Sequence, residues 1–217
     1  MSGPLVPSTA FFGYHFTALV NVPGILTHNI LYSRSEATQR RLIVQEVGER
    51  DILNNTDPVM LEQVRFYWRP KTPMLYVTEG FRHETQYPYP HARCDIPVYI
   101  CPPLRALLTH NAVQLTDRNG AANGCRRGSG LAFARTIPFG KVFHDGPVSR
   151  SERDILQHRQ AEILIPASLP LPEDTFVLVR SPAELATLRE MLPATVLVDR
   201  FRDSDGQGRV RYTQSNS

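Results

Sequence analysis

Short runs of β-prone residues, each closed by proline, glycine or charge, constrain the fold of this 217-residue chain more than any other feature. They are rich in valine, isoleucine and aromatic residues. Segments of this length and composition are typical of strands rather than of helices. We therefore expect strands at 11–19, 64–70, 95–103, 161–171, 175–180 and 195–201.

Helical signals are fewer. The clearest lies at 181–192, where Ser181 suits the N-cap, Pro182 the first position and Glu184 the third residue of a capping box. A second helix is predicted after Pro23 by apolar residues at helical spacing (Val22, Ile25, Leu26 and Ile30). The sum is a strand-rich α+β domain with few long helices.

The composition fits one globular domain, with 41% hydrophobic and 21% charged residues. We expect a single domain over 1–217, in which 1–10 is a polar lead-in and 203–217 a tail that frays. No apolar run is long enough to span a membrane and no signal-peptide pattern opens the chain, so we expect a cytoplasmic protein. The three cysteines favour reduced thiols, and no metal site is expected, because one His- and Cys-containing segment matches no zinc spacing (His83, His91, Cys94 and Cys101).

Residues 117–153 show no strong helix or strand signal and are strongly basic. Between Arg118 and Arg153 the chain carries seven cations and two acids, a net charge of +5. A long segment of this kind inside a compact domain is more often functional than accidental. We interpret it as a basic loop that contacts a nucleic-acid backbone through Arg118, Arg126, Arg127, Arg135, Lys141, Arg150 and Arg153.

Glu162 lies just before an apolar run in "HRQAEILI". If this segment is extended, His158, Gln160 and Glu162 share one face, since side chains two apart in a strand point the same way. One interpretation is a strand-edge carboxylate paired with a nearby arginine, which contributes little. The other is that Glu162 faces a pocket, where a carboxylate stabilises a developing positive charge or accepts a hydrogen bond from a ribose hydroxyl.

His15 and Thr17 share a face of the first predicted strand, "GYHFT". They are either half-buried side chains with internal partners or donors of hydrogen bonds to a ligand. Arg69, in "FYWRPKTPM", follows aromatic residues that are most simply explained as core, and its guanidinium suits a phosphate.

These pieces resemble, in order, the DarT family of DNA ADP-ribosyltransferase toxins. The resemblance rests on "YHFT" with "VPGILTHNIL", on "VRFYWRPKTPMLY" and on "RQAEILI" after a long loop, and it covers roughly residues 11–200. It implies an ADP-ribosyltransferase-like fold, with a central, mostly antiparallel split β-sheet and peripheral helices. It also implies NAD+ as a substrate, single-stranded DNA as the acceptor and a macrodomain antitoxin as a partner.

By this resemblance, Glu162 is the catalytic glutamate. Gln160, which we expect on the same strand face as Glu162, would orient the acceptor base or the ribose. The residues that would bind NAD+ are His15, Thr17, Gly24, Leu26, Tyr67, Arg69, Met74 and Tyr76. The family also uses a catalytic arginine, for which Arg50 has the expected distance from the aromatic segment. Arg40 and Arg41 look more like the motif but lie earlier in the chain.

The predicted function is NAD+-dependent transfer of ADP-ribose to a base in single-stranded DNA, with release of nicotinamide. Two alternatives stay open from the sequence. One is an ADP-ribosyltransferase or NAD glycohydrolase with an RNA or protein acceptor. The other is a non-catalytic nucleic-acid-binding module in which Glu162 is only the partner of an arginine.

Overall fold

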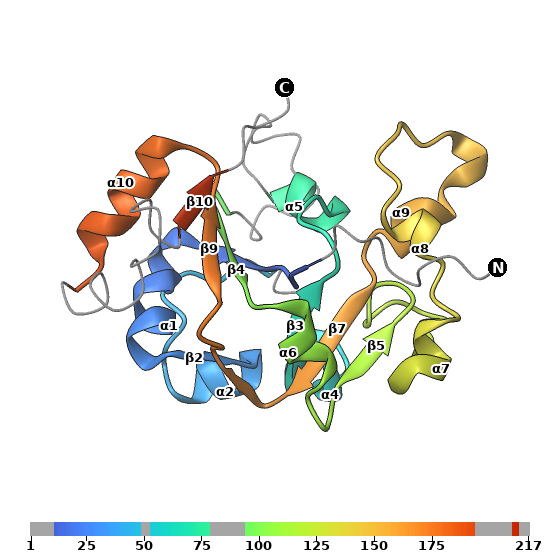
Figure 1. Cartoon of the computed structure of the whole chain (residues 1–217), viewed down its shortest axis with the longest axis horizontal. Helices are drawn as coiled ribbons and strands as arrows, with labels where there is room; N and C mark the ends of the chain where they lie inside the picture. The colour runs from blue at the N-terminus through green and yellow to red at the C-terminus, as the bar shows by residue number, and fades with distance from the viewer. Residues whose placement is uncertain (1–10, 49–52, 79–93, 194–209, 213–217) are drawn as a thin grey trace.

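The computed structural model describes residues 11–48, 53–78, 94–193 and 210–212, and these form two four-stranded sheets and a two-stranded one (Figure 1). The first sheet has the order β1-β4-β9-β10, in which β9 and β10 run parallel and the other neighbours antiparallel. Its strands are β1 (His15–Ala18), β4 (Pro97–Cys101), β9 (Phe176–Val179) and β10 (Val210–Tyr212).

The second sheet has the order β3-β7-β5-β6 and is antiparallel throughout. Its strands are β3 (Gln63–Tyr67), β7 (Glu162–Pro166), β5 (Gln114–Thr116) and β6 (Arg127–Gly128). The two-stranded sheet pairs β2 (Ile30–Tyr32) with β8 (Ser168–Pro170).

Among the described residues, one isolated antiparallel bridge joins the two larger sheets, between the residue before β1 and the last residue of β3, which are edge strands of their sheets. The Tyr14 N–H donates to the Tyr67 carbonyl at 2.9 Å, and the Tyr67 N–H donates to the Tyr14 carbonyl at 2.8 Å. The sheet is therefore split on either side of this bridge. The predicted α+β class, with a mostly antiparallel split sheet, is confirmed.

The helices are short and peripheral. Figure 1 shows α10, which at ten residues is the longest helix in the described part of the chain, at one end of the molecule and α7, α8 and α9 at the other. The helices are α1 (Val22–His28), α2 (Arg34–Gln39), α4 (Pro58–Leu61), α5 (Pro73–Thr78), α6 (Leu104–Leu108), α7 (Gly130–Ala134), α8 (Phe139–Val142), α9 (Asp154–His158) and α10 (Pro182–Met191), with 3₁₀ turns η1 (Leu19–Asn21) and η3 (Arg150–Glu152).

The capping signals explain where α10 begins. The Ser181 hydroxyl accepts the Glu184 N–H at 3.2 Å, and the Glu184 carboxylate turns back to accept the Arg180 N–H at 2.9 Å. Pro182 occupies the first turn, where its missing N–H costs no intrahelical bond. The helix predicted at 181–192 is thus confirmed.

The end of α1 differs from the sequence expectation. Asn29 adopts a left-handed conformation (φ 55°) and ends α1 at His28, so Ile30 belongs to β2 and not to the helix. The segment after β3 forms the helix α5, which opens on Pro73.

The basic segment 117–153 is more regular than predicted, since it contains β6, α7, α8 and η3. The predicted strand at 195–201 and the lead-in 1–10 lie outside the described residues. β10 falls within the tail that was expected to fray, where it pairs with β9.

The pairing of β3 with β7 gives one face to the core and the other to polar residues. Phe66 and Ile163 are opposite each other in the register and are fully buried in the main hydrophobic cluster. Tyr67 is opposite Glu162 on the other face, and Arg65 lies two residues before Tyr67 on that same face. One strand pair therefore provides both the packing and the polar residues described below.

Gly13 lies at a close approach beside the junction of the two sheets. Its N–H donates to the Pro102 carbonyl at 3.0 Å. A Cβ added here would lie 2.3 Å from Leu107 Cδ1 and 3.3 Å from Phe66 Cβ, both in buried core residues. The glycine in "FFGYHF" is thus required by packing.

We expect Gly13→Ala to destabilise the fold by about 1–3 kcal/mol, because a methyl group must be forced into a filled core. Urea unfolding measures the change. Gly140→Ala is the matched control, since a Cβ there meets no atom within 4 Å. Equal stabilities for the two variants would contradict this explanation of Gly13.

Candidate active site

Glu162, the first residue of β7, has a fully buried carboxylate. Arg65 donates to Oε1 twice, from Nε at 3.0 Å and from Nη2 at 2.6 Å. The Gly120 N–H donates to Oε2 at 2.8 Å. Because an unpaired buried charge is costly, these donors are what allow a carboxylate at this position.

The Asn119–Gly120 turn lies between Arg65 and the segment before β7. The Asn119 side-chain oxygen accepts the Arg65 Nη2 at 2.9 Å and the Ala121 N–H at 2.9 Å. Its amide nitrogen donates to Gln160 Oε1 at 3.4 Å. Gln160 therefore reaches the surroundings of Glu162 through Asn119.

The polar row expected for an extended 158–162 segment is not present. His158 ends α9, and the Gln160 N–H donates to the Gln157 carbonyl at 3.1 Å, so the chain is turned before β7. The His158 Nδ1 lies 2.6 Å from the Asp117 carbonyl and is buried there. The prediction that His158 shares a strand face with Glu162 was wrong because helix α9 extends up to it.

Asp117 fixes the start of the basic segment. Its buried carboxylate accepts the Arg126 Nε at 2.9 Å, the Arg126 N–H at 3.0 Å and the Arg118 Nε at 3.3 Å. Burial raises the pKa of Asp117, but these arginine hydrogen bonds lower it by more, so the net shift is downward. The carboxylate stays ionised and holds both ends of the turn that contains Gly120.

His15 lies on the other side of Arg65, in β1. Its Nδ1 is 3.0 Å from the Arg65 carbonyl and donates to it in the tautomer with a proton on Nδ1. Burial lowers the pKa of His15, with a smaller opposing effect of that hydrogen bond and a further lowering by the Arg65 charge. The ring is therefore neutral at neutral pH.

A cavity of about 280 Å³ opens between the β1–α1 segment, β3 and the 42–48 stretch. Asn21 fixes that stretch, because its side-chain oxygen accepts the N–H groups of Val44 at 2.9 Å and Gln45 at 3.0 Å, and its nitrogen donates to the Gln45 carbonyl at 2.8 Å. The nitrogen also donates to Thr17 Oγ1 at 3.0 Å. Residues predicted for NAD+ that line this cavity are His15, Thr17, Gly24, Tyr67 and Met74.

A buried carboxylate beside an arginine, next to a cavity with histidine, threonine and tyrosine walls, suits glycosidic-bond chemistry. A family model described as "ssDNA thymidine ADP-ribosyltransferase, DarT" matches residues 14–203. The chain belongs to the DarT family. This match confirms the family that the motifs predicted. It also confirms the predicted enzyme class, an NAD-dependent ADP-ribosyltransferase that acts on single-stranded DNA.

Solved DarT structures share the fold of this family member. Thermus sp. 2.9 DarT in complex with NAD+ is 19% identical with a TM-score of 0.67, covering 96% of this chain and 98% of that one. The same protein in complex with ADP-ribosylated ssDNA is 18% identical with a TM-score of 0.70, covering 96% and 97%. Thermosipho africanus DarTG in complex with ADP-ribose is 16% identical with a TM-score of 0.64, covering 83% of this chain and 46% of that one. No curated protein sequence matches the chain.

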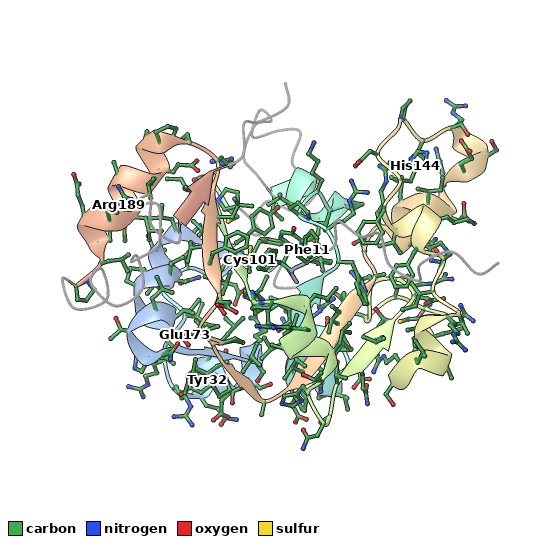
Figure 2. The ribbon with its side chains drawn as sticks, viewed as in Figure 1. Phe11, Tyr32, Cys101, His144, Glu173 and Arg189 are labelled. Atoms are coloured by element: carbon green, nitrogen blue, oxygen red, sulfur yellow. The ribbon has the colours of Figure 1, made fainter. Side chains whose placement is uncertain are left out.

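Several residues predicted for the site in this DarT-family member lie elsewhere. Arg69 is buried and donates to the carbonyls of Val142 at 3.0 Å and His144 at 2.7 Å, and it pairs with Asp145. Figure 2 shows His144 at the end of the molecule that carries α8 and α9, opposite Arg189 on α10. The structure therefore gives Arg69 an anchoring role in the loop after α8 and does not bring it to the cavity.

Leu26 packs in the main core and does not line the cavity. Tyr76 belongs to α5, but its side chain is not described. Arg50, the predicted catalytic arginine, lies outside the described residues. Of its alternatives, Arg40 pairs with Glu36 at 2.7 Å on α2, and Arg41 is exposed.

The cations predicted to contact DNA divide into two groups. Arg118 and Arg126 pair with Asp117, Arg127 donates to the Gly120 carbonyl at 2.7 Å, and Lys141 pairs with Asp154. Arg126, Arg127 and Lys141 are nevertheless exposed, as are the cations of the second group, Arg135, Arg150 and Arg153.

Within the described residues, no group of three or more histidine, cysteine, aspartate or glutamate side chains is placed to hold a metal, and no helix is long and apolar enough to cross a membrane. His83 and His91 lie outside those residues. The structure describes all three cysteines (Cys94, Cys101 and Cys125), and none of them forms a disulfide.

Arg65, Asn119, Gly120 and Asn21 are site residues that sequence reasoning missed. Arg65 had a usable signal, because it alternates with Tyr67 in a predicted strand and so shares its face. The others depend on contacts with distant segments, such as that between Gly120 and Glu162.

We expect Gly120→Ala to lower the rate of ADP-ribosyl transfer by about tenfold or more, because the turn must move away from the carboxylate. A Cβ there would lie 2.9 Å from Glu162 Oε2 and 2.4 Å from Met60 Cε. Initial rates at saturating substrate measure the effect, with Gly140→Ala as the matched control. Wild-type rates in Gly120→Ala would remove this glycine from the support of Glu162.

The lowered pKa of His15 predicts that stability falls as the pH drops below about 6.5. In that window the unfolded histidine takes up a proton and the buried one does not, so protons favour unfolding. Thermal unfolding between pH 7.5 and 5, which spans about the ordinary titration range of histidine, should show a shallower loss for His15→Gln than for the wild type. Parallel curves would contradict the role of burial at His15.

Proposed function

We propose that this protein transfers ADP-ribose from NAD+ to a thymidine base in single-stranded DNA and releases nicotinamide, acting as the toxin of a toxin–antitoxin pair. The observation that carries the proposal is the buried Glu162 carboxylate, held by Arg65 and Gly120 beside the cavity of a DarT-family chain. NAD+ and ADP-ribosylated ssDNA are the ligands bound by Thermus DarT, which has the same fold.

In this proposal NAD+ lies in the cavity between β1–α1 and β3. As the nicotinamide–ribose bond breaks, the ribose acquires oxocarbenium character, and Glu162 stabilises it by accepting a hydrogen bond from a ribose hydroxyl. Neutral His15 and Thr17 contribute hydrogen bonds along the β1 wall. Tyr67, whose pKa is raised chiefly by burial, keeps its phenolic proton.

The acceptor base must be unstacked to reach the ribose, which favours single strands over a duplex. We assign Asn119 and Gln160 to the acceptor side, because they follow β5 and precede β7 next to Glu162. The exposed cations of the 117–153 segment then contact the DNA backbone. Arg50 remains our candidate for the catalytic arginine.

The toxin acts in the cytoplasm, where NAD+ and DNA are both available. A macrodomain antitoxin that removes the modification is the partner implied by the family resemblance, and the name DarTG of the Thermosipho protein fits this pairing. The alternative acceptors, RNA and protein, are outcomes of the test below.

The test incubates the protein with labelled NAD+ and separate acceptors: ssDNA with thymidine, ssDNA without it, RNA and protein. We expect label only on thymidine-containing ssDNA. Transfer to thymidine-free DNA, RNA or protein alone would overturn the acceptor, and no transfer with a folded protein would overturn the activity. A non-catalytic binding module would give no NAD+-dependent stabilisation, whereas NAD+ at 100 times its dissociation constant should add roughly 2.7 kcal/mol.

Glu162→Gln should lower the rate on the order of 10²–10³-fold, because the amide cannot stabilise a positive charge. The matched control is Glu173→Gln, at an exposed glutamate labelled in Figure 2 on the side of the molecule away from α8 and α9. Initial rates at saturating NAD+ and ssDNA give the comparison. Retention of more than about a tenth of the wild-type rate would remove Glu162 from the catalytic role.

A further inference from the structure

The carboxylate of Glu162 has an unequal set of partners on its two oxygens. Oε1 accepts two donors from one guanidinium, at 3.0 and 2.6 Å, whereas Oε2 accepts the Gly120 N–H at 2.8 Å. An ionised carboxylate oxygen has room for about two hydrogen bonds. By this count Oε1 is saturated, and Oε2 has one acceptor position left for another donor.

Arg65 connects the wall of the cavity to the carboxylate. The Glu162 side chain is fully buried, and it is Arg65 and Asn119, not Glu162, that line the cavity wall. The Arg65 side chain keeps 29% of its surface exposed. The arginine therefore reaches from the cavity to the carboxylate behind it.

The arginine itself is held at both its backbone and its guanidinium. Its strand position is fixed by the pairing of β3 with β7, and its carbonyl lies 3.0 Å from His15 Nδ1. Its Nη2 also donates to Asn119 Oδ1 at 2.9 Å. A guanidinium fixed in this way defines one rotation of the carboxylate about its last bond, since a planar fork has a preferred geometry.

We propose that Arg65 is the positioning residue for Glu162: by saturating Oε1 it fixes the carboxylate so that the remaining acceptor position on Oε2 meets the ribose hydroxyl. This inference rests on the proposed function of Glu162. Arg65 acts through the glutamate and is distinct from the catalytic arginine for which Arg50 was predicted. This positioning role explains why an arginine stands between Val64 and the aromatic residues Phe66 and Tyr67 in β3.

The alternative explanation is a purely structural ion pair that stabilises the fold without affecting the reaction. The two explanations differ in kinetics. Loss of a positioning residue lowers kcat while leaving KM for NAD+ nearly unchanged, because the carboxylate remains present but misaligned. Loss of a structural ion pair changes stability and leaves the kcat of the folded protein unchanged.

The experiment compares Arg65→Lys and Arg65→Met with Arg180→Met. Arg180 is the matched control, because its Nε and Nη2 donate to one oxygen of Glu184 at 2.9 and 2.6 Å, far along the chain at the start of α10. We expect kcat to fall about 10²-fold in Arg65→Met and less in Arg65→Lys, with KM for NAD+ within about threefold of wild type in both. Arg180→Met should transfer at the wild-type rate.

A further readout separates positioning from structure. Added guanidinium chloride at low, non-denaturing concentration should restore part of the rate of Arg65→Met and none of the rate of Glu162→Gln. A wild-type kcat in Arg65→Met, or an unchanged kcat with only a lowered melting temperature, overturns the proposal.

A double-mutant cycle of melting temperatures keeps the test open if Arg65→Met folds poorly. The single variant leaves a buried charge without a partner, so Arg65→Met with Glu162→Gln should melt above Arg65→Met alone. Additive shifts would show no coupling and would overturn the ion pair itself. If the wild-type protein transfers no ADP-ribose, the proposed function fails. The melting-temperature cycle still tests the Arg65–Glu162 coupling, because it does not depend on activity.

Discussion

The rest of the site depends on the cost of burying the Glu162 carboxylate. The charge is tolerated because donors come from two separate parts of the chain: the guanidinium of Arg65 on β3 and the N–H of Gly120 in the turn after β5. Neither donor is close to Glu162 in sequence, so the charge is paired only when β3, β5 and β7 have assembled. The same antiparallel pairing that buries Phe66 and Ile163 in the core thereby completes the site.

The cavity beside this carboxylate lies where the sheet splits. The Tyr14–Tyr67 bridge is the point at which β1 and β3 last touch as strands, and beyond it the β1–α1 segment diverges from β3. The close packing at Gly13 holds that junction, and Asn21 closes the far wall by binding the backbone of Val44 and Gln45. A cavity with one wall from each sheet follows from this topology, as does the placement of His15 against the Arg65 carbonyl.

The sequence predicted what local patterns can encode. Strands β1, β3, β4, β7 and β9, the capped helix α10, and the placement of His15, Thr17, Gly24 and Met74 follow from alternation, caps or motifs within a few residues. What it could not predict depends on distant partners. Arg65 and Glu162 are 97 residues apart. Arg69 was predicted to bind a phosphate, but its guanidinium donates to backbone carbonyls at the end of α8 and in the loop after it. The extended conformation assumed before Glu162 failed because the helical turn of α9 ends at His158, immediately before β7.

The basic segment shows why net charge alone is a poor guide to a DNA contact. Arg118 and Arg126 form ion pairs with Asp117, and these pairs keep the Asp117 carboxylate ionised. Arg127 binds the carbonyl of Gly120, the same residue whose N–H reaches Glu162. These cations build the turn that supports the carboxylate, so a phosphate that drew Arg127 away would also loosen Gly120. Under the proposed function, the loop that contacts the DNA is therefore coupled to the Glu162 carboxylate through one residue, Gly120, and acceptor binding can adjust that carboxylate without any large motion.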